Sequence, residues 1–184
     1  MFIQTEPTPN PASLKFLPGR MVLASGTASF AEPAAAERSP LARQLFRIEG
    51  VAGVFLGHDF VTVTKDDAAD WYALKPAILG VIMDVYTRGE AVIDEGFAAT
   101  PESTAAEDDD EIVGQIKELI DTRVRPAVAQ DGGDIIYHGF EDGIVYLHMQ
   151  GSCAGCPSST ATLRSGIENL LKHYIPEVTE VRSV

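Results

Sequence analysis

The chain has 184 residues and a net charge of −13, with 27 Asp or Glu residues against 14 Lys or Arg residues. This acidity argues against a nucleic-acid-binding protein and against docking on an anionic membrane, and no apolar run reaches the ~18–20 residues that a membrane span requires. The first residues show no secretion signal, and two cysteines are too few for a secreted disulfide framework, so an intracellular thiol motif is expected.

The first part of the chain carries signals for short strands, at residues 1–5, 13–17, 20–23, 51–56 and 60–64. The last two are rich in β-branched and aromatic residues and flank the segment Gly57-His58-Asp59, which predicts a hairpin. Residues 32–37 are rich in Ala and contain Pro, and we expect a loop there.

Two helices are predicted in the same unit. Ser39 can cap a helix that begins at Pro40 and ends at Gly50. Asp70 can cap a longer helix over residues 71–86, with Gly89 at its end. This pattern predicts a small α+β sandwich, and the unit has no cysteine and no His clustered with carboxylates, so no chemistry is expected in it.

Residues 98–110 separate two units. This segment holds five acidic residues, no basic residue and no aliphatic side chain larger than Ala. Such a composition cannot bury enough apolar surface to offset its ordering entropy, so it predicts a flexible acidic linker. The expected organisation is therefore an N-terminal domain over residues 1–97, the linker over 98–110 and a C-terminal domain over 111–184.

The second unit also predicts an α+β domain, with strands at 135–140, 144–150 and 178–182. One helix is expected at 111–124, and another after a cap at Ser158 or Ser159, with its apolar positions between residues 163 and 174. Pro126 should interrupt or restart the first helix. Residues 131–134 are expected to form a turn, His148 to be an exposed strand residue and Arg125 to be a solvated surface residue. The fold class is thus α+β, with two small α/β-sandwich domains joined by the linker.

Cys153 and Cys156 lie three residues apart, between a predicted strand and the start of a helix. The helix dipole and free N–H groups at such a position favour thiolates. The pair could ligate an iron–sulfur cluster, exchange disulfides, bind zinc or simply begin a helix. A cluster needs four thiolates and this chain supplies two, so cluster binding would require the same loop from a second chain.

The sequence resembles a known family at several places. The segment Gly151-Ser152-Cys153-Ala154-Gly155-Cys156-Pro157-Ser158-Ser159-Thr160 and the preceding Asp131-Gly132-Gly133-Asp134-Ile135 resemble the NifU-type C-terminal domain. The opening Phe2-Ile3-Gln4-Thr5-Glu6-Pro7 and residues 54–65 resemble the N-terminal domain of Nfu proteins. The resemblance covers nearly the whole chain, in the order of the family.

The resemblance implies an iron–sulfur cluster scaffold or carrier rather than an enzyme. Cys153 and Cys156 would be the cluster ligands, and a labile [4Fe–4S] cluster would be shared between two chains of a homodimer. Expected partners are upstream cluster-assembly factors and apo iron–sulfur client proteins, with no nucleic acid and no membrane. The alternative function is a CxxC dithiol–disulfide oxidoreductase.

The expected location follows from the start of the chain. Mitochondrial members of the family carry a presequence, whereas this sequence begins directly at the N-terminal domain. A bacterial cytoplasmic protein is therefore predicted, with the mitochondrial matrix after removal of a presequence as the alternative.

Overall fold

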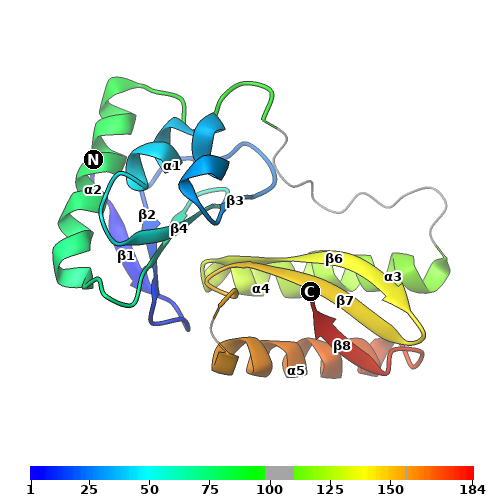
Figure 1. The fold of residues 1–184 in the computed structure, drawn as a ribbon. Coiled ribbons are helices and arrows are strands. Elements are labelled where there is room, and N and C mark those ends of the chain that lie inside the picture. The colour runs from blue at the N-terminus through cyan, green and yellow to red at the C-terminus, as the bar shows by residue number, and fades with distance from the viewer. Residues whose placement is uncertain (98–109, 156) are drawn as a thin grey trace.

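The computed structural model describes residues 1–97, 110–155 and 157–184, without the side chains of 157–159, and shows two α+β domains. Each domain has its own hydrophobic core: one is built from buried residues between Ile3 and Val85, the other from buried residues between Ile116 and Val181. Figure 1 shows the two bodies side by side. The predicted fold class is confirmed, whereas residues 98–109 of the predicted linker lie outside the described residues.

The N-terminal domain contains a five-stranded sheet in the order β1-β2-β5-β4-β3, with its neighbouring strands antiparallel. Its strands are β1 (Gln4–Pro7), β2 (Ser13–Leu17), β3 (Ala28–Phe30), β4 (Val51–Leu56) and β5 (Val61–Lys65). Its helices are the 3-10 helix η1 (Pro33–Arg38), α1 (Pro40–Leu45) and α2 (Trp71–Arg88). The predicted hairpin of residues 51–56 and 60–64 is confirmed, with β5 beginning one residue later.

The helix caps predicted in this domain are confirmed. The Ser39 side chain accepts a hydrogen bond from the backbone N–H of Ala42, and the Asp70 side chain accepts one from that of Tyr72. Gly89 ends α2 in the left-handed conformation.

Three local predictions for this domain are wrong. Residues 20–23 form no strand, because the backbone N–H groups of Val22 and Leu23 donate to the carbonyl of His58 instead of to a strand. The edge strand is β3, and the expected loop at 32–37 is η1, which begins at Pro33. The helix predicted to reach Gly50 ends at Leu45.

The C-terminal domain packs its helices on one face of a three-stranded sheet with the order β6-β7-β8. Its elements are α3 (Glu111–Leu119), the π-helical turn η2 (Ile120–Val124), α4 (Arg125–Gln130), β6 (Gly133–Glu141), β7 (Ile144–Gly151), α5 (Pro157–Tyr174) and β8 (Glu180–Ser183). The hairpin β6-β7 is antiparallel, and β8 pairs parallel to β7.

Side-chain alternation along β7 explains which face is covered. Val145, Leu147 and Met149 are buried in the core, whereas His148 points to solvent as predicted. Pro126 falls in the first turn of α4, where its missing N–H is tolerated, and the π-helical turn precedes it. The predicted interruption of the first helix is therefore confirmed.

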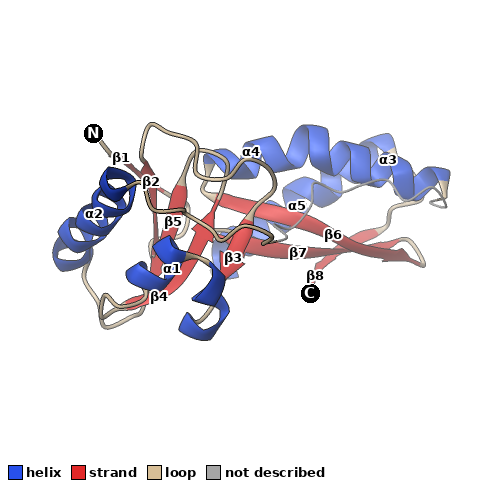
Figure 2. Cartoon of the chain, turned by 90° about the horizontal axis from the view of Figure 1, so that it is seen from above, coloured by secondary structure: helices blue, strands red, loops and turns tan. Residues whose placement is uncertain are grey.

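The sheet of the N-terminal domain has different neighbours on its two sides. Figure 2 shows α2 on one side of the sheet and the C-terminal domain beyond the other. The strand end that leads into the cysteine segment lies at this contact, because β7 approaches both β4 and β5. Among the described helices, none is both long and apolar enough to cross a bilayer.

Candidate functional site

The site predicted from the sequence lies on the cysteine loop, residues 151–155, which connects β7 to α5. Gly151 and Gly155 have φ values of 65° and 79°, a left-handed conformation that costs a glycine little. Between them the backbone turns tightly, and the N–H of Ala154 donates to the carbonyl of Gly151. This turn directs the Cys153 side chain inward.

Cys153 is 6% exposed and belongs to the core of the C-terminal domain. Its sulfur packs against the backbone of Gly133 so closely that a Cβ at Gly133 would lie 2.5 Å from Sγ and 2.8 Å from the carbonyl oxygen of Gln150. Burial raises the pKa of the Cys153 thiol from its usual value of 9.0 to about 11, although a hydrogen bond with Ser152 lowers it in part. The thiol is therefore neutral near pH 7.

Neighbouring hydrogen bonds hold the cysteine loop in this shape. The Ser152 hydroxyl donates to the carbonyl of Asp131, and the Thr160 hydroxyl in α5 donates to the carbonyl of Cys153 at 3.0 Å. The loop is thus tied to the segment before β6 and to the first turns of α5.

Cys156 lies outside the described residues, so the predicted pairing of the two sulfurs stays a prediction. Within the described part of the chain, no group of three or more His, Cys, Asp or Glu side chains could hold a metal ion. The sequence holds two cysteines, half of the four thiolates that an iron–sulfur cluster requires.

An ion pair that was not predicted joins α4 to β6, one residue after the Gly133 that packs against Cys153. Arg125 Nε and Nη2 donate to the two carboxylate oxygens of Asp134 at 2.8 and 2.7 Å, and the backbone N–H of Ile135 donates to the same carboxylate. Burial lowers the pKa of Arg125, but hydrogen bonds with Asp134 and the charge of Asp134 raise it more, so its net shift is upward.

The prediction of a solvated Arg125 is therefore wrong. The turn predicted at residues 131–134 is confirmed for Asp131 and Gly132, which has a φ of 80°, but β6 already begins at Gly133. Asp134 is 3% exposed and already belongs to β6. The partners lie nine residues apart, on a helix and a strand, a spacing that no local pattern connects.

Residues of the N-terminal domain also reach this site, where no chemistry was expected. Asn10 Nδ2 donates to the carbonyl of Ala154 in the cysteine loop at 3.2 Å. Three further side chains donate to the segment before and within β6: Lys15 to the carbonyl of Gln130, Thr27 to the carboxylate of Asp134 and Thr62 to the carbonyl of Gly132.

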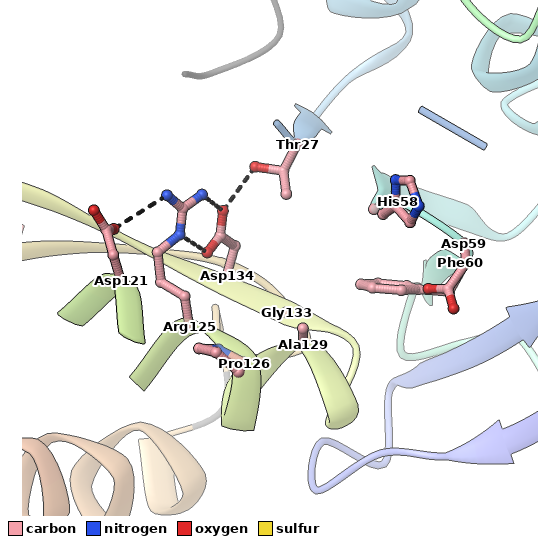
Figure 3. A pocket seen from close by; sticks show the side chains of 11 residues that line it. Thr27, His58, Asp59, Phe60, Asp121, Arg125, Pro126, Ala129, Gly133 and Asp134 are labelled. Atoms are coloured by element: carbon pink, nitrogen blue, oxygen red, sulfur yellow. Dashed lines mark hydrogen bonds and ion pairs between the residues drawn. The ribbon is translucent and has the colours of Figure 1, made fainter. Parts of the chain in front are cut away.

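A cavity of about 450 Å³ lies beside these contacts, between the two domains. Figure 3 shows Thr27, His58, Asp59 and Phe60 on one side of it, facing the Arg125–Asp134 pair and the end of α4. The domain contact is therefore polar and incompletely filled, which is typical of interfaces between separable domains.

Two family models match this chain, one in each domain. Residues 3–89 match the family model described as "Scaffold protein Nfu/NifU N terminal", and residues 116–182 match the "NifU-like domain". A solution structure of a NifU-like protein from Saccharomyces cerevisiae is 30% identical in sequence to this chain. The match has a TM-score of 0.47 and covers 52% of this chain and 86% of that chain.

Full-length relatives give a stronger match. The chain is 59% identical to the human "NFU1 iron-sulfur cluster scaffold homolog, mitochondrial" and 54% identical to the protein of the same name from Drosophila virilis. All of this chain aligns in both cases, and it spans 72% of the human protein and 62% of the fly protein.

The names of these relatives contradict one prediction. Both are mitochondrial proteins by name, so the expectation of a bacterial cytoplasmic protein is wrong. That expectation relied on where the sequence begins, which carries no information about location. The matches to both domains and to the human relative show that this chain belongs to the Nfu family of iron–sulfur cluster scaffold proteins.

Proposed function

We propose that this chain carries a [4Fe–4S] cluster between two copies of itself and passes the cluster to apo-proteins in mitochondria. Cys153 and Cys156 of each copy would supply the four thiolates that the cluster requires. The observation that carries the proposal is that the sequence holds two cysteines three residues apart, directly before α5, and that the first of them, Cys153, lies on a loop bounded by Gly151 and Gly155. The names of the relatives support the scaffold role.

Transfer in this proposal is an exchange of thiolate ligands. Each step breaks one iron–sulfur bond to the carrier and forms one to a cysteine of the client, so no oxidant or reductant is needed. Iron binds thiolate and not thiol, so loading the cluster releases the proton of Cys153 and unloading returns it. Burial of Cys153 in the cluster-free chain favours the neutral thiol and therefore favours release.

Anaerobic reconstitution with iron and sulfide tests this proposal. We expect a brown protein with a broad absorbance band near ~400 nm and about four irons per dimer, and activation of an apo-[4Fe–4S] enzyme on mixing. Cys153→Ser and Cys156→Ser should each abolish cluster binding and leave both domains folded. A full cluster in either single variant would contradict the four-thiolate count.

The dithiol–disulfide alternative makes a different prediction. Its motif also begins a helix, but efficient exchange requires an exposed thiol of low pKa. Cys153 is buried and the pKa of its thiol is raised. A colourless protein that reduces disulfides stoichiometrically would support this alternative and overturn the carrier proposal.

A further inference from the structure

The outer face of the N-terminal sheet carries an ordered row of side chains. Strand pairing places Glu6, Lys15, Thr62, Phe55 and Ser29 opposite one another across the five strands, so they lie on one face. The other face carries the apolar side chains that pack in the domain core with the helices. By this alternation alone, the row should face solvent.

The centre of this row is nevertheless buried. Thr62 is 1% exposed, Phe55 is 2% exposed and Lys15 is 7% exposed. Lysine and threonine are rarely buried to this extent without a partner. Because the C-terminal domain lies on this side of the sheet, it is the cover for the row.

Each buried side chain of the row meets a segment next to Cys153. Thr62 Oγ1 donates to the carbonyl of Gly132 at 2.7 Å, and Lys15 Nζ donates to the carbonyl of Gln130 at 3.1 Å. Phe55 packs against Gly151, where a Cβ would lie 3.0 Å from its ring.

Hydrogen bonds within the N-terminal domain orient Asn10 for its contact with the cysteine loop. Its side-chain oxygen accepts from the N–H of Ala12, and its backbone is held by the Thr8 hydroxyl. These bonds fix the side chain with its NH₂ group directed outward, to the carbonyl of Ala154. The loop that presents Asn10 is therefore ordered by its own domain, and the contact costs little additional conformational entropy.

From these contacts we infer that the outer face of the N-terminal sheet is a docking surface whose partner is the cysteine loop of the same chain. The docked domain contacts the cysteine loop itself, at residues 151–154, and the neighbouring segment of residues 130–134. It therefore holds the loop in the shape that turns Cys153 inward. A second chain needs the same loop for a shared cluster, which is the part of the inference that rests on the proposed function. The N-terminal domain and a second chain therefore compete for the loop.

The cavity beside the contact supports a separable arrangement. A gap of about 450 Å³ between the domains, next to a polar contact, leaves fewer apolar contacts to break on opening than a continuous core would. The surface is thus suited to a docking that can be reversed when the cluster site assembles.

Solution scattering of the cluster-free full chain tests the docking. Lys15→Met and Thr62→Val remove one interdomain donor each while keeping side-chain size, and each should shift the ratio of docked to open chains about fivefold. Thr64→Val is the matched control, because Thr64 lies two residues further along β5 and bonds Ser13 within its own domain. We expect a compact monomer for the wild type and the control. The double variant, which combines Lys15→Met with Thr62→Val, should have a larger radius of gyration.

The results separate the two parts of the inference. Equal radii for wild type and double variant, an extended wild type, or a compact domain-swapped dimer would each overturn intramolecular docking. If the double variant loses the Trp71 fluorescence of the folded domain, Thr27→Val replaces it, because Thr27 donates to Asp134.

Cluster reconstitution, followed by absorbance, tests the competition. We expect faster cluster uptake by the opened variant than by the wild type and the control. Equal uptake by an opened variant would overturn the competition. If no chain takes up a cluster, the proposed function fails, while the scattering result still decides the docking.

Discussion

The buried ion pair between Arg125 and Asp134 leads to a quantitative prediction for the substitution Asp134→Asn. The carboxylate accepts two hydrogen bonds from Arg125, one from Thr27 and one from the N–H of Ile135, at 2.7–2.8 Å. Removing one partner of such a pair leaves the other charge buried and costs about 3–5 kcal/mol. Arg125 would keep Asp121 at 3.4 Å, so we expect a loss near the lower end, about 3 kcal/mol.

Native-state hydrogen exchange of the β6 and β7 amides would measure this loss in the C-terminal domain. Trp71 is the one tryptophan of the chain and lies in the other domain, so its fluorescence during urea unfolding reports that domain separately. Asp84→Asn is the control, because its pair with Arg88 is exposed and should contribute less than about 1 kcal/mol. A loss below about 1 kcal/mol for Asp134→Asn would refute the reasoning.

Three further predictions concern the cores and the cysteine. Gly133→Ala should destabilise the C-terminal domain by about 1–3 kcal/mol in urea unfolding, because its Cβ has no room beside Cys153, whereas Gly139→Ala on the same strand meets nothing within 4 Å and should have little effect. Burial raises the pKa of Cys153 from 9.0 to about 11, so between these values the folded chain keeps a proton that the unfolded chain loses. The stabilisation from this thiol should be fully present below pH 9 and be lost as the pH rises from 9 to 11, and this loss should be absent in Cys153→Ser when urea unfolding is compared across that range. Ser39→Ala should cost about 1–2 kcal/mol in Trp fluorescence unfolding, because the buried hydroxyl caps α1 and donates to Val92; an unchanged midpoint would contradict this.

Local signals in the sequence predicted much of each domain. The caps at Ser39 and Asp70, the two hairpins and the position of Cys153 before α5 each depend on a few neighbouring residues, and the structure confirms them. The edge strand β3 is three residues long and has too little pattern to be found from the sequence.

Contacts between distant segments could not be predicted in the same way. The alternation of Val and Thr in β5 predicts a strand with one buried face and one solvent-exposed face. No neighbouring residue in the sequence indicates that the other domain covers Thr62. The pairing of Arg125 with Asp134 likewise depends on how α4 packs beside β6. The sequence located the cysteines, and the structure added the groups that surround them.

Most hydrogen bonds between the two domains join side chains of the N-terminal domain to the backbone of the C-terminal domain. The side chains of Asn10, Lys15 and Thr62 all end on main-chain carbonyl groups of the C-terminal domain. Thr27, by contrast, donates to the carboxylate side chain of Asp134. Apart from that bond, the N-terminal domain recognises the path of the opposing backbone rather than its side chains. Many substitutions around the cysteines would leave the docking intact, and a chimera that joins this N-terminal domain to a relative's cysteine domain should close as the natural chain does.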